Sequence, residues 1–438
     1  MTVRPPNVVI IHGHDLGRFL SCYGSPSIPS PHLQDFAAQS VVFDNAFSTA
    51  PLCTPARSSL FTGQSPHVNG LMGLVHSGWR YRKSVRTMPE LLRPAGYDTV
   101  LVGLQHEHHN PTVLGFDEVH GMGFLPRALP VAAEANAWLA HRGGQPTPFL
   151  LTVGMWEVHR PWPREDYPPA DPHTVEVPPF LPDTVHTRAD LSGFYGSIRQ
   201  MDQAVGIVLA AIDRFCDPAH TLVLFTTDHG AAFPRAKGTL YDPGVGVALL
   251  VRPPSTMDIQ PGRRTRMVSH LDVVPTLLDL AGSPVASHLE GRSLLPVLRD
   301  DRDDDRNLFF EKTFHDVYDP IRAVRTSRYK YIRNFTGGPA ILLSKDLEES
   351  RTRQGMGDAH LRPRPPAELY DLRDDPWELR NLAAQQEHAK TVAMLDDALT
   401  AWMKDTHDPL ACGPVDEPAP LSRLPDAQPD LPHLHSSG

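Results

Sequence analysis

A lone cysteine stands in the segment APLCTPARSSLFTG, where Cys53 comes two residues before Pro55 and four before Arg57. The other cysteines of the chain are far away and form no C-x-x-C pair, which disfavours a disulfide framework or a cysteine zinc site. Proline is favoured in the first turn of a helix, and the amides at a helix N-terminus attract an anion. Cys53 is therefore either a reactive group at an anion site or a small buried residue, the usual fate of a free cysteine.

Histidines and carboxylates follow four short apolar runs of the chain. They are His14 and Asp15 after NVVII, His106 after TVLVGL, Glu157 and His159 after PFLLTVGMW, and Asp228 and His229 after TLVLFTT. Any one of them could merely cap a helix or form a turn. In an open parallel sheet, however, ligands bind at the carboxyl ends of the strands. The pattern predicts one site at that edge, where Asp15, Asp228 and His229 could bind a divalent cation.

The apolar runs predict an α/β fold built in layers. Five runs are rich in β-branched residues and leucine without alternation, as in strands buried on both faces of a parallel sheet: 7–15, 98–106, 148–159, 221–230 and 245–254. Helical patterns lie between them, at 30–40, 87–97, 192–215 and 269–282. We expect a mostly parallel central sheet flanked by helices, with a smaller C-terminal α+β part.

The chain has 438 residues, more than one core usually organises, so we expect a large domain and a smaller one. The charge run LRDDRDDDRN at 298–307 reads as a solvated connection between a catalytic α/β domain at 1–300 and an α+β part at 308–412. In that second part, 321–335 alternates like antiparallel strands and 374–405 has a helical pattern. The proline-rich tail at 413–438 should be irregular.

Composition limits the partners. The net charge of -10 is a poor match for nucleic acid or an anionic membrane, so neither is expected as a partner. No apolar run approaches the roughly 18 residues of a membrane span. The first residues, MTVRPPNVVIIHGHD, enter a strand-like run without the charged and apolar regions of a signal peptide. We expect a soluble, cytoplasmic protein.

Four segments together resemble the type I, formylglycine-dependent sulfatases of the alkaline-phosphatase-like superfamily. CTPAR matches the C-x-P-x-R signature of that family, in which a formylglycine-generating enzyme oxidises the cysteine to formylglycine. The surrounding segment 30–74, FTTDHG and ELYDLRDDPWELRNLA match other family signatures. NGLMGL, FTTDHGAAFPRAKGTLYDPG and YDPIRAVRTSRYKYIRN are most similar to the sulfamidases, the N-sulfoglucosamine sulfohydrolases or heparan N-sulfatases. The resemblance covers most of the chain and implies an alkaline-phosphatase-like fold.

The resemblance implies a role for each matched residue. A thiol that attacked sulfur would form a thiosulfate-like ester with no easy exit, whereas a hydrated aldehyde has one hydroxyl to attack sulfur and a second to expel sulfate. The implied roles are: Cys53, the formylglycine precursor; Arg57, contact with the oxygens of the nucleophile; His106, base for the second hydroxyl; His159, sulfate contact and acid for the leaving group; and Lys237, sulfate binding. His315 matches the substrate pocket of the sulfamidases. Lys237 and His315 could each instead be ordinary surface residues.

The implied ligands of one divalent cation are His14, Asp15, Cys53, Asp228 and His229. Calcium is usual in the family, but most members have two adjacent aspartates in place of His14-Asp15 and Asp-Asn in place of Asp228-His229. Imidazoles soften the site, which favours manganese or zinc, as in the related phosphonate monoester hydrolases. His14 could also lie outside the ligand set.

A second departure concerns the sulfate-binding cations. Leu104 stands where the family has a sulfate-binding lysine, and His108 or His109 could supply a replacement charge.

The sequence thus predicts a metal-dependent sulfohydrolase that cleaves a sulfate ester or sulfamate of a small saccharide, or an aryl sulfate, through a formylglycine derived from Cys53. A phosphonate or phosphate monoester hydrolase is the alternative enzyme, because phosphoryl and sulfuryl transfer need a similar positively charged site. A non-catalytic sulfate-binding protein is the third possibility, if Cys53 is never oxidised.

Overall fold

The computed structural model of the chain describes residues 4–123, 125–142, 144–300 and 306–419. Of the charge run at 298–307, positions 301–305 lie outside the described residues, as does the predicted tail from 420 to 438. The described part of that tail, 413–419, contains no helix or strand, as predicted.

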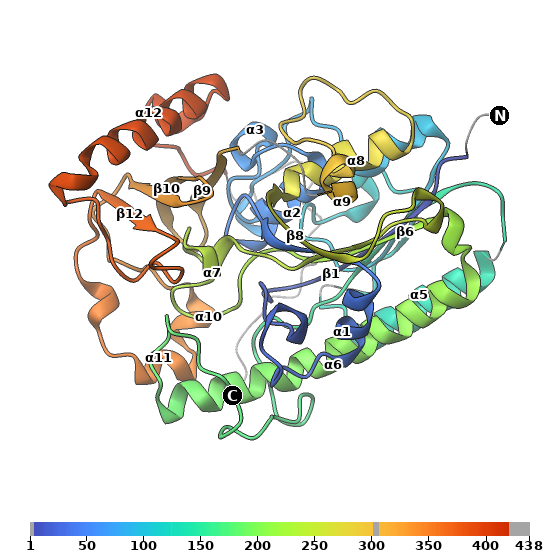
Figure 1. Ribbon diagram of the computed structural model, residues 1–438, viewed down its shortest axis with the longest axis horizontal. Coiled ribbons are helices and arrows are strands. Elements are labelled where there is room, and N and C mark those ends of the chain that lie inside the picture. Colours follow the sequence, from blue (N-terminus) through green and yellow to red (C-terminus); the bar gives the residue numbers. More distant parts are fainter. Residues whose placement is uncertain (1–3, 124, 143, 301–305, 420–438) are drawn as a thin grey trace.

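An eight-stranded sheet forms the centre of the molecule, in the spatial order β4-β3-β5-β1-β6-β7-β2-β8 (Figure 1). Its strands are β1 (Asn7–Gly13), β2 (Val41–Phe47), β3 (Asp98–Gly103), β4 (Glu118–His120), β5 (Phe149–Gly154), β6 (Thr221–Thr227), β7 (Leu249–Arg252) and β8 (Gly262–Ser269). All pairings are parallel except those of β7 with β6 and β2. The predicted mostly parallel sheet is confirmed.

One strand direction was predicted wrongly. The run at 245–254 was expected to be another parallel strand, but β7 within it is antiparallel to both neighbours. Parallel strands need a long crossover, usually a helix, whereas the chain between β6 and β7 contains only the four-residue helix α7 (Asp242–Val245). That connection returns along the same edge of the sheet and reverses the chain.

Helices cover both faces of the sheet (Figure 1). They are α1 (Pro31–Ala38), α2 (Cys53–Thr62), α3 (Pro66–Asn69), α4 (Met88–Leu92), α5 (Ala128–Arg142), α6 (Val185–Phe215), α8 (Val273–Leu280), α9 (Leu295–Asp300), α10 (Lys345–Glu348), α11 (Arg351–Gly355) and α12 (Ala389–Asp405). Val9 and Ile11 of β1 pack toward α1, α5 and α6, whereas Val8 and Ile10 pack toward α2, α4, α8 and α9. Both faces of β1 are therefore buried, which explains its unbroken apolar run.

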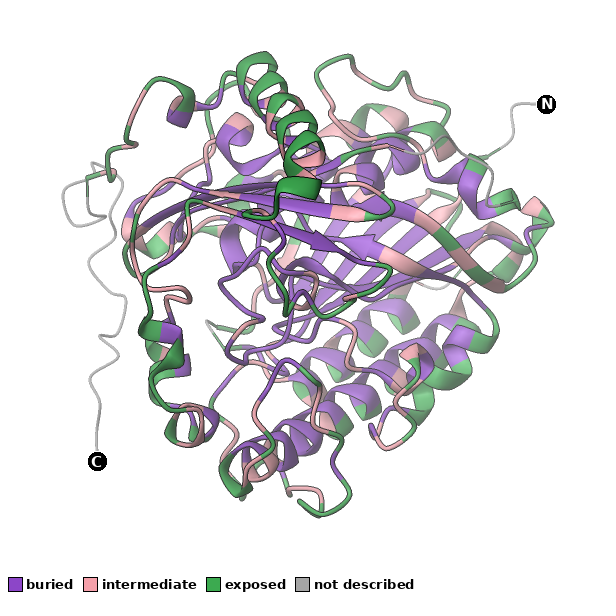
Figure 2. Cartoon of the chain, turned by 60° about the vertical axis from the view of Figure 1, so that its left-hand side comes forward, coloured by how far each residue is buried: buried purple, intermediate pink, exposed green. Residues whose placement is uncertain are grey.

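Burial follows these layers. Figure 2 shows the strands of the central sheet buried and the outer surfaces of the flanking helices exposed. The longest helix, α6, contributes many buried residues, such as Phe194, Ile198 and Val205. Within the described residues, no helix is both long and apolar enough to cross a membrane.

A second, antiparallel sheet lies at one end of the molecule, in the order β12-β11-β10-β9 (Figure 1). Its strands are β9 (Leu308–Phe314), β10 (Tyr318–Arg325), β11 (Tyr329–Asn334) and β12 (Ala367–Asp371). The antiparallel pair predicted within 321–335 is confirmed, since Ile321 pairs with Asn334.

The helix predicted over 374–405 is shorter than expected, because α12 begins at Ala389. In the segment before it, the Asp375 carboxylate accepts hydrogen bonds from the amides of Leu379 and Arg380. Such local side-chain bonds offer the backbone an alternative to the helical ladder.

Candidate active site

The sheet order brings four predicted residues together. Strands β3, β5, β1 and β6 are consecutive neighbours in the central sheet. His106, His159, Asp15 and Asp228 follow the carboxyl ends of these strands, respectively. Parallel strands end at the same edge, so the side chains converge there.

The N-terminus of α2 reaches this edge. Leu52, in an extended conformation, precedes the helix, and Cys53 is its first residue. The Cys53 Sγ atom lies 3.6 Å from Nε2 of His229 and 4.0 Å from Oδ1 of Asp15. The thiol is 5% exposed, so it lies inside the site and not at the protein surface.

Imidazole nitrogens and carboxylate oxygens lie close together beside Cys53. The Nδ1 atom of His14 lies 3.0 Å from Oδ1 of Asp15 and 3.5 Å from Oδ2 of Asp228. On the other side, Nε2 of His229 lies 3.0 Å from Oδ1 of Asp15. Asp15 and Cys53 belong to two overlapping groups that could hold a metal ion, one with His14 and His159 and the other with Asp228 and His229. Carboxylate oxygens and imidazole nitrogens suit a divalent cation, so the described residues fit such an ion near Cys53.

The backbone fixes these donors in place. Asp15 has a φ of 51°, which is uncommon for a residue other than glycine, and its amide donates to Oδ1 of Asp228 at 2.9 Å. The ring of His229 donates from Nδ1 to the carbonyl of Gly230 at 2.9 Å, which orients Nε2 toward the Asp15 carboxylate. A Cβ at Gly230 would lie 1.9 Å from the Pro243 carbonyl oxygen, so only glycine fits beside this histidine.

Opposite charges balance within the buried site. Burial alone would lower the pKa of His14, but Asp228, Cys53 and Asp15 raise it to about 9. Burial also opposes the charged form of His229. Asp228 and Asp15 outweigh this effect and hold the pKa of His229 well above its usual value. Burial by itself would raise the pKa of the Cys53 thiol, but the charges of His14 and Lys237 and a hydrogen bond with His106 hold it well below its usual range.

Arg57 contacts different atoms from those expected. Its guanidinium donates to Oδ2 of Asp228 at 3.0 Å, to the Gly13 carbonyl at 3.0 Å and to Nδ1 of His12 at 2.7 Å. The sequence resemblance had implied contact with the oxygens of the nucleophile. In the structure Arg57 is fully buried and paired with Asp228, and the implied contact with the nucleophile stays a prediction.

Lys237 contacts side chains from three distant segments of the chain. Its ammonium donates to Asp15 at 2.7 Å, to Nε2 of His159 at 3.2 Å and to Oδ2 of Asp346 at 2.8 Å. Only 1% of its side chain is exposed, which rules out the reading of Lys237 as a surface lysine. Asp346 was missed by sequence analysis, because the segment SKDLEES carries no recognisable motif and lies far away along the chain.

Two histidines in the site are neutral. Burial and the Lys237 charge lower the pKa of His159 to about 4, and burial with the charge of His14 lowers that of His106 to about 4. His159 donates from Nδ1 to the Arg160 carbonyl at 2.5 Å, which directs Nε2 toward Lys237. A neutral ring can accept a proton, as general base catalysis requires.

The remaining candidates are His315, Leu104, His108 and His109. His315 directly follows β9, and its Nδ1 lies 3.2 Å from Asp316, whose other carboxylate oxygen accepts the Lys345 amide at 2.9 Å. Leu104 is 2% exposed. His108 and His109 stack on each other with ring centroids 4.3 Å apart, and Nδ1 of His108 lies 2.9 Å from the Asn110 carbonyl, so both rings are engaged within their own loop.

A mostly parallel sheet that gathers histidines, carboxylates and a buried lysine at its carboxyl edge is typical of an α/β enzyme. The chain belongs to the sulfatase family: the Sulfatase family model matches residues 6–283. A second model, "N-sulphoglucosamine sulphohydrolase, C-terminal", matches 233–349, a range that contains both Lys237 and Asp346. The protein is therefore a sulfatase.

Individual relatives agree with this assignment. Human N-sulphoglucosamine sulphohydrolase is 31% identical over 94% of this chain and 92% of its own length. A solved structure from glycosaminoglycan metabolism in Bacteroides thetaiotaomicron superposes with a TM-score of 0.74 at 19% identity, covering 93% of this chain and 98% of that one. Another, solved with D-glucosamine-2-N,6-O-disulfate as its substrate, has a TM-score of 0.70 at 18% identity over 92% of this chain and 99% of that one. At these identities the two structures establish the shared fold.

Proposed function

We propose that the chain is a formylglycine-dependent and metal-dependent sulfohydrolase that cleaves a sulfate ester or a sulfamate of a small saccharide. The position of Cys53 carries the proposal. Its sulfur lies at the N-terminus of α2, within 4.0 Å of Asp15 and 3.6 Å of His229. A side chain oxidised at this position would have its oxygens at the cation and at the helix amides, where negative charge is favoured.

The ligand set proposed for the cation consists of His14, Asp15, Asp228, His229 and residue 53. Such a cation would lower the pKa of a hydroxyl at residue 53 and offset the charge of the sulfuryl group. Two imidazoles among the donors favour Mn²⁺ or Zn²⁺ over the Ca²⁺ that the family resemblance suggests. Arg57 holds Asp228 at 3.0 Å in the orientation that this requires.

A formylglycine at position 53, produced by a formylglycine-generating enzyme, would supply two hydroxyls on one carbon once hydrated. One would attack sulfur and the other, on losing its proton, would expel sulfate. His106 suits the second step, because its low pKa keeps the ring neutral and able to accept that proton.

Lys237 and His159 would hold the sulfuryl group and the leaving group. The buried ammonium of Lys237 offers a positive charge in place of the lysine replaced by Leu104. Its contact with Nε2 of His159 at 3.2 Å places the two groups around the same volume. The negative charge of a bound substrate would raise the pKa of His159 from about 4, toward the range in which the ring can donate a proton.

The substrate class follows from the relatives. The human relative is named for N-sulphoglucosamine, and one solved relative binds a disulfated glucosamine. His315, in the turn between β9 and β10, would contact the sugar. The next residue, Asp316, holds this turn to α10 by accepting the Lys345 amide. A net charge of -10 favours a small substrate over a long sulfated polymer.

The decisive test has two parts. Mass spectrometry of the peptide containing Cys53, from protein made in its native host, should detect formylglycine. The same preparation should hydrolyse N-sulfoglucosamine or an aryl sulfate faster than an aryl phosphonate. An unmodified thiol would support a non-catalytic sulfate-binding protein, and a preference for the phosphonate would support a phosphonate monoester hydrolase; either result contradicts the proposal.

A further inference from the structure

The carboxylate of Asp346 lies beside Lys237 in the proposed anion site. Asp346 is the second residue of α10, and its Oδ2 accepts a hydrogen bond from Lys237 at 2.8 Å. The same ammonium contacts Asp15 at 2.7 Å and His159 at 3.2 Å. Asp346 therefore shares a hydrogen-bonding group with the residue proposed to protonate the leaving group.

Asp346 is a negative charge in a site built for an anion. Burial alone would raise its pKa, but Lys237 outweighs that effect and lowers it below the usual value, so the group is ionised. Lys237 also has Asp15 as a partner, so it does not depend on Asp346 alone for charge compensation. A second carboxylate beside a sulfate-binding lysine weakens sulfate binding, unless it recognises another part of the substrate.

The chemistry of a carboxylate defines what it can recognise. An ionised carboxylate only accepts hydrogen bonds, and its two oxygens have about four acceptor positions in total. Two of these are occupied, by Lys237 and by the Ser344 hydroxyl. The side chain is 23% exposed, whereas that of Lys237 is 1% exposed, so part of Asp346 remains accessible to a ligand.

Sulfamates and sulfate esters differ at this point. The bridging atom of a sulfamate is an N–H donor, whereas the bridging oxygen of a sulfate ester is only an acceptor. A carboxylate next to the bridging atom attracts the first and repels the second. We propose that Asp346 is a specificity residue that binds the bridging nitrogen of an amino-sugar sulfamate, so that the chain prefers S–N over S–O cleavage. This inference rests on the proposed sulfohydrolase function.

The reaction then balances as follows. A hydroxyl of hydrated formylglycine at position 53, with its proton already lost to solvent, forms the new bond to sulfur while the S–N bond breaks and its electron pair goes to nitrogen. The nitrogen gains one proton from His159, and the amino sugar leaves. Positive charge develops on nitrogen as it takes the proton, and the Asp346 carboxylate stabilises that charge.

The test compares substrates, using full-length protein with verified formylglycine. Asp346→Asn should lower kcat/KM for N-sulfoglucosamine about 100-fold, the effect of removing one charge-stabilising contact. Its kcat/KM for an aryl sulfate should fall far less, so the ratio of the two values should decrease at least about ten-fold. Asp346→Glu should restore part of the ratio, because it restores the carboxylate.

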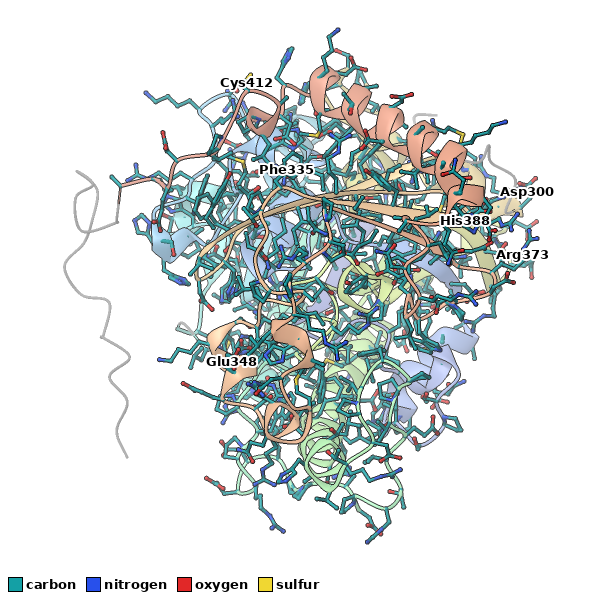
Figure 3. The ribbon with its side chains drawn as sticks, turned by 90° about the vertical axis from the view of Figure 1, so that its left-hand side faces the viewer. Asp300, Phe335, Glu348, Arg373, His388 and Cys412 are labelled. Carbon is teal, nitrogen blue, oxygen red and sulfur yellow. The ribbon has the colours of Figure 1, made fainter. Side chains whose placement is uncertain are left out.

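A matched control lies on the same helix. Glu348 of α10, labelled in Figure 3, pairs with Arg353 at the surface at 3.1 Å. Glu348→Gln should leave both substrates within about three-fold of wild type, because exposed ion pairs contribute little. Melting temperatures of all variants check that they are folded.

Product binding gives a readout independent of turnover. Glucosamine, a cation at neutral pH, should bind wild-type protein more tightly than N-acetylglucosamine by calorimetry, and Asp346→Asn should abolish that difference. Equal losses on both substrates, with unchanged glucosamine binding, would show that Asp346 only positions Lys237 and would overturn the inference. Aryl sulfate hydrolysis without sulfamate hydrolysis would also overturn it while leaving the sulfohydrolase function intact. Failure on every sulfate and sulfamate would instead contradict the proposed function itself.

Discussion

The guanidinium of Arg57 binds the carboxylate of Asp228 at 3.0 Å, and neither side chain is exposed at its charged end. Asp228 is thereby held with one oxygen toward Arg57 and the metal-binding group, while its other oxygen accepts the amides of Asp15 and His229 at 2.9 and 2.8 Å. The arginine of the C-x-P-x-R signature is thus paired with Asp228, one of the proposed metal ligands.

Removing Arg57 should therefore damage both stability and metal binding. Arg57→Gln removes the arginine partner of a fully buried carboxylate, which should cost about 3–5 kcal/mol in the free energy of unfolding. Metal affinity should fall about 10- to 100-fold, as for the loss of other groups that orient ligands. Denaturant unfolding and calorimetric metal titration measure the two effects.

The control is Arg86→Gln, which breaks a surface pair with Glu90 and should cost no more than about 1 kcal/mol in the free energy of unfolding. Equal effects of the two variants would contradict the role given to Arg57.

The metal preference should depend on His229. Replacing its imidazole with an amide oxygen, as in His229→Asn, hardens the site and should shift selectivity from Mn²⁺ or Zn²⁺ toward Ca²⁺. We expect the ratio of Mn²⁺ to Ca²⁺ affinity to decrease at least about ten-fold, measured by titration of chelator-treated protein. His288→Asn, far from the site along the chain, is the control. An unchanged ratio would remove His229 from the ligand set.

The role of His159 can be read from leaving groups. If it donates the proton, His159→Asn should slow the hydrolysis of a sugar sulfate or sulfamate about 10²- to 10⁴-fold. An aryl sulfate with an acidic phenol leaving group needs little protonation, so its rate should change much less. Steady-state kinetics with a series of phenyl sulfates measures this effect: the rate of the variant should depend more steeply on the pKa of the leaving group than the rate of the wild type. A uniform loss over the series would assign His159 to sulfate binding alone.

A buried histidine outside the site should make stability depend on pH. Nδ1 of His67 lies 2.8 Å from Glu311 of β9, and its Nε2 lies 2.8 Å from Thr406. Burial opposes the charged ring, but Glu311 raises the pKa of His67 above its usual value, with smaller effects from Asp408 and Arg322. Because the folded-state pKa exceeds the unfolded one, the stabilisation is complete below about pH 6.5 and is lost as pH rises through the folded-state value.

His67→Gln should therefore cost more stability at pH 6 than at pH 9, as measured by urea unfolding of both proteins at each pH. The exposed His173→Gln is the control and should show no such difference. A larger cost at pH 9 than at pH 6 would mean that the neutral ring is the stabilising form.

Much of the site could be predicted from the sequence, because strand ends and site residues are adjacent along the chain. The apolar runs that end before His14, His106, His159 and Asp228 are buried strands of one sheet, and parallel strands bring their carboxyl ends to a common edge. The C-x-P-x-R signature placed Cys53 at the start of a helix, where the structure has it.

Contacts between distant segments could not be predicted in the same way. The antiparallel direction of β7 depends on how the chain returns after β6, and the partners of Arg57 depend on how α2 packs against β1 and β6. Asp346 reaches Lys237 only because the second sheet packs against the first, and nothing in SKDLEES signals that contact.

Local sequence thus determined which side chains were available and at which strand ends they lie, because hydrophobic burial and helix signals act over a few residues. The tertiary structure decided which charges meet. The ion pairs of Lys237 with Asp346 and of Arg57 with Asp228 each join residues more than a hundred positions apart. Such pairs exist only after the sheets and helices have packed together.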